Sequence, residues 1–245
     1  MKLLLGSGNV NPNLLDNNGR TPLSLAASGG REGIVKLFLE RGDVNPDLAD
    51  SSGRTPLSLA AERGSESVVQ LLLERGDVNP NSPDRSGRTP LSFATERAHG
   101  DVVKLFLESE DVNHNLSDTN GLTPLLFAAA GGYQDLVELL LQRGDVNPNS
   151  PDSHGRAPLF LAAKGGHEGA VKLLLERGDV NPAPSDSNGQ TPLLLAAARG
   201  YQGVMELLLQ RGDVNPNWPD RNGQTPLSLA ASEQCSQRAR PARLR

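Results

Sequence analysis

The sequence predicts an all-α solenoid, in which helix–loop–helix units stack side by side and turn-rich fingers join one unit to the next. Residues 19–27 read GRTPLSLAA, and residues 53–61 repeat this nonapeptide without a change. Related nonapeptides follow at the same interval. A segment repeated at a fixed period of this length is typical of arrays whose units pack on their neighbours. An aromatic content of 3% also favours small interfaces of Leu and Ala over one large core.

The period sets the expected domain organisation. We expect a partial first repeat over 1–15, six full repeats over 16–219, a partial last repeat over 220–231 and an irregular Arg-rich tail over 232–245. By the same period, residues 2–5 correspond to part of a second helix, so we expect a slice of a longer array or a truncated gene product. The nonapeptides begin at Gly19, Gly53, Gly87, Gly121, Gly155, Gly189 and Gly223.

One repeat shows how its elements arise. Thr21 suits a helix N-cap, and Pro22 suits the first helical position, where its missing N–H costs nothing. The glycines at 29–30 end this short first helix. Apolar residues over 34–39 recur at the spacing of an amphipathic second helix. The segment 43–53 is rich in Asn, Asp, Pro, Ser and Gly, so we expect a finger built from turns.

Charge and composition argue against several classes of protein. The net charge is −5, and the four Arg and one Glu of residues 232–245 leave residues 1–231 at −8. An acidic array argues against a nucleic-acid partner, because nucleic-acid binders usually carry a basic surface. No apolar stretch approaches the ~20 residues of a membrane span. Cys235 is the sole cysteine, which excludes an internal disulfide and fits a reducing compartment. We expect a monomer in the cytoplasm, with the nucleus as the alternative.

The repeat resembles the ankyrin repeat. The resemblance rests on Gly-x-Thr-Pro-Leu-x-x-Ala-Ala, on a second helix introduced by glycine as at 166–175, and on the Gly-Asp-Val-Asn that follows. It extends from residue 1 to about residue 231. The resemblance implies a stack of helix–loop–helix–finger units that acts as a non-catalytic protein-recognition surface. It also implies that partners contact the fingers and the first helices.

Several positions depart from the family pattern. The period here is lengthened in the finger, whose Asn-Pro-Asn-Ser-Pro-Asp motif is similar to that of long fungal arrays. Ala98 replaces the glycine between the helices of the third repeat, and Ala157 replaces the capping threonine of the fifth, so we expect these repeats to be the least stable. The histidine of the family's Thr-Pro-Leu-His motif is replaced by Ser24, Ser58, Ser92, Leu126, Phe160, Leu194 and Ser228.

No motif indicates catalysis, a metal site or a cofactor. The four histidines do not share a helical turn, and two of them, His99 and His167, occupy a helix-entry position where Tyr also occurs. The glycine pairs lack the Gly-Lys-Ser/Thr that a phosphate-binding loop requires. The Asp that recurs in each repeat is explained by the chemistry of turns. We therefore expect no enzymatic activity, no cofactor and no metal.

Candidate partner-binding residues lie on the fingers and at the ends of the first helices. Arg20, Arg54 and Arg88 follow the leading glycines of three adjacent repeats, so stacking would align them as a ladder able to bind carboxylates or phosphates. The alternative is that these exposed arginines have no binding role, because Gly-Arg-Thr-Pro-Leu is itself a frequent form of the family motif. The other candidates are Glu62, Arg63, Glu96, Arg97 and Trp218.

Trp218 has two interpretations of equal weight: a contact residue at an interface, or a cover for the end of the apolar core. For the whole chain, the leading hypothesis is a non-enzymatic protein–protein interaction scaffold. The alternative is the structural or sensor arm of a larger multidomain signalling regulator, whose activity lies outside this chain. A nucleic-acid binder is the third hypothesis, kept open by the Arg-rich tail and disfavoured by the acidic array.

Overall fold

The computed structural model describes the backbone of residues 10–238 and the side chains of residues 10–232. Every regular element in this part of the chain is an α-helix, and the helices occur in pairs along the sequence. The predicted all-α class and the helix–loop–helix repeat are confirmed. Residues 2–5, which we expected to belong to a second helix, lie outside the described residues.

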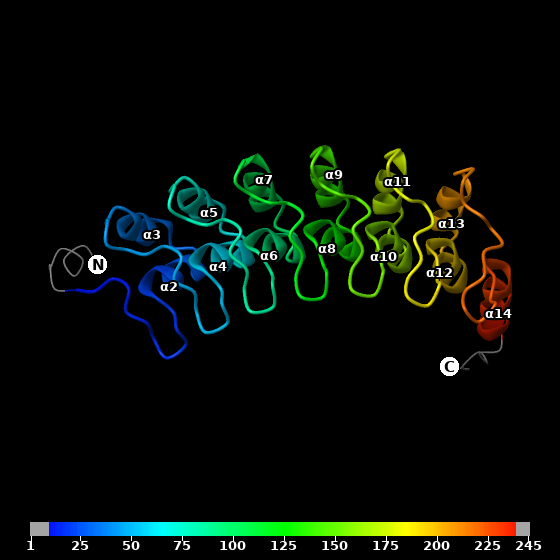
Figure 1. Ribbon diagram of the computed structural model, residues 1–245, viewed down its shortest axis with the longest axis horizontal. Helices are drawn as coiled ribbons and strands as arrows, with labels where there is room; N and C mark the ends of the chain where they lie inside the picture. Colours follow the sequence, from blue (N-terminus) through cyan, green and yellow to red (C-terminus); the bar gives the residue numbers. More distant parts are fainter. Residues whose placement is uncertain (1–9, 239–245) are drawn as a thin grey trace, which may run out of the picture. The chain divides into compact units, whose positions relative to one another are not determined.

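The chain divides into two compact units, residues 1–124 and 125–245. In the N-terminal unit, the first helices α2, α4 and α6 pack on one another in one row, and the second helices α3, α5 and α7 pack in another (Figure 1). Each first helix also packs on the second helix of its own repeat. The helices are α2 (Pro22–Ser28), α3 (Glu32–Leu39), α4 (Pro56–Arg63), α5 (Glu66–Leu73), α6 (Pro90–Glu96) and α7 (Gly100–Glu108).

The C-terminal unit has the same two rows. α10, α12 and α14 pack in sequence as first helices, and α9, α11 and α13 pack as second helices. α14 extends past residue 231 into the segment that we expected to be irregular. The helices are α8 (Pro124–Gly131), α9 (Gln134–Gln142), α10 (Pro158–Gly165), α11 (Glu168–Glu176), α12 (Pro192–Arg199), α13 (Gln202–Leu209) and α14 (Pro226–Arg238).

Threonine and proline start the first helices as expected. In α2 the Thr21 hydroxyl accepts a hydrogen bond from the Ser24 N–H at 3.0 Å, and Pro22 is the first helical residue. The Ser24 hydroxyl donates to the Thr21 carbonyl at 2.8 Å. This serine therefore braces the helix start at the position where the family has histidine. The N-cap of α10 is Ala157, which offers no capping side chain.

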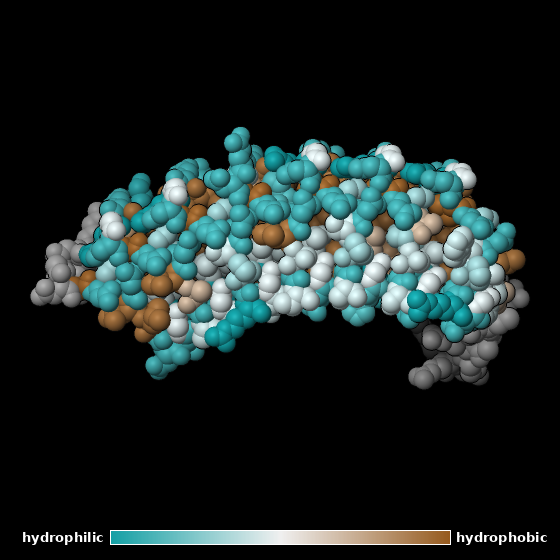
Figure 2. All heavy atoms as spheres, viewed as in Figure 1, coloured by the Kyte–Doolittle hydropathy of each residue, from teal (hydrophilic) through white to brown (hydrophobic). Residues whose placement is uncertain are grey.

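The second helices are amphipathic. In α3, Val35 and Phe38 are buried against the stack, whereas Lys36 and Glu40 are exposed. Figure 2 shows hydrophilic side chains over the row of second helices, with hydrophobic residues between them. Burying a Val or a Phe removes enough apolar surface from water to contribute about 1.5–3 kcal/mol each. Because a single pair cannot bury both of its faces, the repeats depend on stacking.

In each finger, an aspartate carboxylate organises the turn that leads into the first helix. Oδ1 of Asp50 accepts the N–H groups of Ser52 and Arg54 at 2.8 and 2.9 Å, and the Asp50 N–H donates to the Arg54 carbonyl. The same pair of bonds to backbone N–H groups two and four residues later forms in every repeat. The carboxylates are those of Asp16, Asp50, Asp84, Asp118, Asp152, Asp186 and Asp220.

In the first three nonapeptides, the leading glycine lies where two repeats meet. Gly53 has a φ of 83°, which favours glycine, and a Cβ added to it would lie 2.8 Å from the backbone nitrogen of Arg85. Arg85 belongs to the next finger, and its N–H donates to the Ser52 carbonyl at 3.0 Å. The glycine is therefore required both by the turn and by the close approach of the next repeat. The nonapeptide is a structural unit.

Asparagine side chains join neighbouring fingers. Oδ1 of Asn81 accepts the N–H of Asn113 at 2.8 Å, and its Nδ2 donates to the carbonyl of Asp111 at 2.7 Å. We call this two-bond contact the asparagine bridge. It explains the second Asn of the Asn-Pro-Asn motif, which bonds to the finger one repeat further on. The same bridge is formed by Asn13 and Asn149.

Asp47 stands at a bridge position and makes half of the contact. Its Oδ2 accepts the N–H of Asn79 at 2.9 Å, but its Oδ1 is buried without a hydrogen-bond partner among the described residues. The Asp77 carbonyl, which corresponds to the acceptor in the asparagine bridge, cannot donate to a carboxylate. Burial raises the pKa of Asp47, as does the Asp77 carboxylate, and the bond from Asn79 offsets this in part.

Arginines that follow the second helices also tie adjacent repeats. Arg75 forms an ion pair with Asp77 at 2.7 Å and donates to the Leu39 carbonyl of the preceding second helix at 3.1 Å. A cation at the C-terminal carbonyls of a helix also complements the helix dipole. In the third repeat Ser109 stands at this arginine position. The same carbonyl contact is made by Arg177 and Arg211.

We predict that Ala98→Gly stabilises the protein. Ala98 has a φ of 58°, in the left-handed region that costs a residue with a Cβ about 1 kcal/mol or more. The corresponding Gly64 has a φ of 75°. We expect the free energy of unfolding to rise by about 1 kcal/mol, measured by urea denaturation. The reverse change, Gly64→Ala, should destabilise, because the new Cβ would lie 2.6 Å from the His99 ring. Equal stability of Ala98→Gly and the native chain would contradict this account.

We also predict that Asp47→Asn stabilises the protein and that the gain depends on pH. The amide completes the bridge, which adds about 1 kcal/mol at neutral pH. Because the pKa of Asp47 is raised on folding, the folded protein holds this proton more tightly than the unfolded chain. The native chain therefore recovers stability as the pH falls through that raised pKa, and the gain of the variant shrinks.

Urea midpoints measured from neutral pH down to about pH 4 test this prediction. Asn81→Asp is the matched control, since it introduces the same defect into an intact bridge and should destabilise at neutral pH. A gain for Asp47→Asn that does not change with pH would contradict the assigned role of the carboxylate.

Candidate interaction surface

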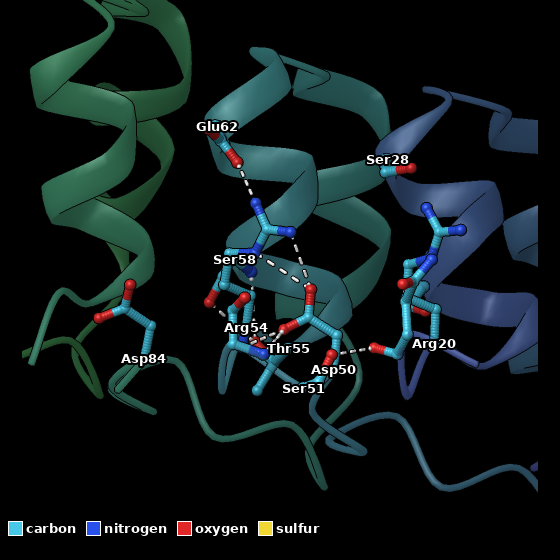
Figure 3. A network of polar contacts seen from close by, with 12 residues as sticks. Arg20, Ser28, Asp50, Ser51, Arg54, Thr55, Ser58, Glu62 and Asp84 are labelled. Atoms are coloured by element: carbon cyan, nitrogen blue, oxygen red, sulfur yellow. Dashed lines mark hydrogen bonds and ion pairs between the residues drawn. The ribbon is translucent and has the colours of Figure 1, made fainter. Parts of the chain in front are cut away.

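The ladder arginines are held by carboxylates of their own repeats. Nη2 of Arg54 lies 2.9 Å from Oδ2 of Asp50, and Nη1 lies 3.0 Å from Oε2 of Glu62 in α4 (Figure 3). The Asp50 side chain is 3% exposed and that of Arg54 29%. The Arg54 guanidinium therefore bridges the finger and the first helix, and much of its binding capacity is used within the chain.

Arg20 and Arg88 are paired in the same way. Arg20 lies 2.9 Å from Asp16, and Arg88 lies 3.0 Å from Asp84. Arg88 also contacts Glu96 at 3.3 Å, and its guanidinium lies 4.4 Å from the centre of the Phe93 ring. All three arginines are thus paired within the chain. A role of these three arginines in binding a partner stays a prediction.

Burial and hydrogen bonding act in opposite directions on the finger carboxylates. Burial would raise the pKa of Asp50, but the backbone N–H and the guanidinium of Arg54 outweigh it, so the pKa lies below the usual value. The pKa of Asp152 is lowered against its burial in the same way by Arg156. For Asp16, the backbone N–H of Arg20 is the main cause of a lowered pKa. These carboxylates stay ionised at neutral pH, which keeps the ion pairs intact.

An open hollow of about 520 Å³ lies along the row of first helices in the N-terminal unit. It brings together residues from three adjacent repeats, including five of the eight candidates. Arg88 and Glu96 lie outside it. The hollow is lined by Arg20, Ser28, Arg54, Leu59, Glu62, Arg63, Arg97 and His99.

The floor of this hollow is an ion-pair network that crosses between repeats. Oε1 of Glu62 accepts from Nη2 of Arg97 at 3.1 Å, while Oε2 of the same residue accepts from Arg54. Nε2 of His99 lies 3.1 Å from the Glu62 carbonyl oxygen, near the end of α4. His99 lines the hollow and is the N-cap of α7, which agrees with the helix-entry position expected from the sequence. Its ring also packs over Gly64, which leaves no room for a Cβ there.

Two arginines at the rim remain open to solvent. Arg63, the last residue of α4, is exposed and forms no ion pair among the described residues. The side chain of Arg97 is 53% exposed although it contacts Glu62. Four guanidinium groups line the hollow, those of Arg20, Arg54, Arg63 and Arg97, and three carboxylates are bonded to them, those of Asp16, Asp50 and Glu62. The positive charges therefore exceed the negative charges by one. The hollow is therefore a positively charged site within an acidic array.

Trp218 lies in the C-terminal unit, apart from these residues. The residue is 57% exposed, and it lines a second hollow that lies between two fingers. A side chain with this exposure does not seal a core, so its position fits a contact residue better than a cover.

The described residues contain neither a cluster of metal ligands nor a membrane-spanning helix. They contain no group of three or more side chains able to hold a metal ion. Within the same part of the chain, no helix combines the length and apolar character needed to cross a bilayer.

Comparison with known proteins identifies the family. The family model for ankyrin repeats in three copies matches residues 1–84, 45–118, 91–186 and 180–240. The chain belongs to the ankyrin repeat family. Ankyrin repeats generally mediate protein–protein interactions. No curated protein sequence matches the chain.

Three solved structures show the same fold. The ankyrin repeat domain of Bcl-3, a member of the IkappaB family, is 29% identical with a TM-score of 0.76, covering 87% of this chain and 95% of that domain. The ankyrin repeat protein EF0377 is 26% identical with a TM-score of 0.72 and coverages of 78% and 97%. An ankyrin repeat domain from Acinetobacter baumannii AYE is 28% identical with a TM-score of 0.70 and coverages of 77% and 96%.

Proposed function

We propose that this chain is a non-enzymatic scaffold that binds a partner protein through its fingers and first helices. The hollow of the N-terminal unit receives an acidic side chain of the partner. The observation that carries this proposal is the pair of open arginines, Arg63 and Arg97, above an ordered ion-pair network. Arginine binds carboxylates in a planar, bidentate geometry that a flexible ammonium group does not match.

The ion-pair network gives the surface its rigidity. Arg54 and Glu62 are fixed by contacts on both sides, so little side-chain entropy is lost there when a partner docks. The partner carboxylate then contacts the two rim arginines without displacing Asp50 or Glu62. Arg63 thus binds without holding the surface, whereas Arg97 both binds and contacts the network through Glu62.

The test uses charge-neutral variants that spare the network carboxylates. The double variant Arg63→Gln and Arg97→Gln removes the rim charges and keeps side chains of high helix propensity. The matched control, Lys36→Gln and Lys104→Gln, removes the same charge from exposed positions on the second helices α3 and α7. Affinity capture from lysate with mass spectrometry, followed by titration of the captured protein, compares the two variants with the native chain.

We expect the arginine variant to bind a captured partner about tenfold more weakly, with reduced dependence on salt, and the lysine variant to bind as the native chain does. A partner bound equally by all three proteins would contradict the placement of the site. Equal losses in both variants would show a general charge effect and would also contradict it.

A further inference from the structure

One finger of the C-terminal unit lacks its bridging asparagine. Ala183 stands at the position of Asn149 in the preceding finger. The backbone is held alike in both, because the Ala183 N–H donates to Oδ1 of Asn181 at 3.0 Å and the Asn149 N–H donates to Oδ1 of Asn147 at 2.9 Å. The methyl group of alanine cannot form the two bonds of the asparagine bridge.

The backbone groups that the bridge would use are left open. In the asparagine bridge of Asn149, the partners are the N–H of Asn181 and the carbonyl of Asp179, at 2.8 and 2.7 Å. One repeat later, these correspond to the N–H of Asn215 and the carbonyl of Asp213. Neither has a hydrogen-bond partner among the described residues. A donor and an acceptor therefore stand side by side on an exposed finger.

A hollow of about 170 Å³ lies at this place. Its lining includes Ala183, Leu193, Val214 and Trp218, together with the residues that carry the open backbone groups. This volume is several times the roughly 30 Å³ that a water molecule occupies in the liquid, so it admits a small planar group. Trp218, the sole tryptophan of the chain, stands where the preceding finger has Pro184. It adds a flat aromatic wall.

The chain itself shows which chemical group suits such a pair of backbone groups. Asn13, Asn81 and Asn149 each satisfy both partners with one carboxamide. Asp47 offers a carboxylate at the same position and satisfies the N–H alone, which leaves one oxygen buried and unpartnered. A carboxamide is therefore matched to this site and a carboxylate is not.

We propose that the hollow beside Ala183 binds the side-chain carboxamide of an asparagine or glutamine carried by a partner protein. The carboxamide oxygen accepts the N–H of Asn215, its NH₂ group donates to the carbonyl of Asp213, and its plane lies against Trp218. The partner thus supplies the carboxamide that Asn149 of this chain supplies in the preceding finger. This site lies in the C-terminal unit and does not depend on the arginine hollow of the N-terminal unit.

The test is a titration of the full chain with two probes of nearly equal shape, N-acetyl-glutamine N-methylamide and N-acetyl-glutamate N-methylamide. Fluorescence of Trp218 and the ¹⁵N–¹H resonance of Asn215 report binding. We expect the glutamine probe to shift both signals and to bind about tenfold more tightly than the glutamate probe, because it makes one more hydrogen bond.

Three variants locate the binding. Ala183→Asn should slow hydrogen exchange at the Asn215 N–H and abolish the effect of the glutamine probe, since the new side chain occupies the site. Trp218→Ala should weaken probe binding about tenfold, measured by the Asn215 resonance. Asn217→Ala, a change in the same finger outside the lining of the hollow, should bind as the native chain does.

Several results would overturn the proposal. They are equal binding of the two probes, no shift of the Asn215 resonance at saturating glutamine probe, or unchanged binding by Ala183→Asn. Ala183→Asn could slow hydrogen exchange at Asn215 while neither probe binds the native chain. This result would confirm the bridge geometry but would overturn the proposal that the site recognises a carboxamide.

Discussion

A carboxylate that accepts two backbone N–H groups in each finger, and is buried in most of them, is the interaction on which the rest of the structure depends. The Asp50 carboxylate gathers two backbone N–H groups and the guanidinium of Arg54 within the space of one turn. Hydrogen bonds to charged groups contribute about 1.5–3 kcal/mol each, which is large for a short exposed turn. The turn presents the Ser52 carbonyl to the next repeat and sets the direction in which the following first helix begins.

This arrangement links the stability of the array to the proposed binding surface. The arginine that neutralises Asp50 also contacts Glu62, and Glu62 contacts Arg97 of the next repeat. A contact needed for stacking therefore also orders the floor of the hollow. The rim residue Arg63 takes no part in the network, so it can bind a partner without a cost in stability. The fingers that stack the repeats thus also supply two arginines, Arg20 and Arg54, to the proposed binding surface.

The repeat architecture could be predicted because its signals are local. Thr21, Pro22 and the glycine at 19 each act within one turn of chain, and their recurrence reveals the period. The site was harder to predict, since it depends on pairs distant in sequence. Arg97 reaches Glu62 across a repeat boundary, and the turn chemistry of Asp50 accounts for its presence without revealing its ion pair.

The finger beside Trp218 shows a second limit of the sequence. Asn-Pro-Asn is typical of a turn, and a turn alone explains both asparagines. That the second asparagine bonds to the next finger becomes visible only when the fingers are placed side by side. The exchange of Asn for Ala183 then changes from a neutral substitution in a loop to the loss of a bridge. Trp218 stands out in the sequence as the sole tryptophan, but the missing bridge at Ala183 cannot be recognised there.

Native-state hydrogen exchange of an Asp50→Ala variant tests the central role of the carboxylate most directly. We expect faster exchange at the N–H groups of Ser52 and Arg54, which lose their acceptor, and at the Arg85 N–H, which bonds to the reordered turn. The N–H of Arg88, held by Asp84, should exchange as before. Unchanged exchange at Arg54 and Arg85 would contradict the claim that the carboxylate organises the turn and the junction.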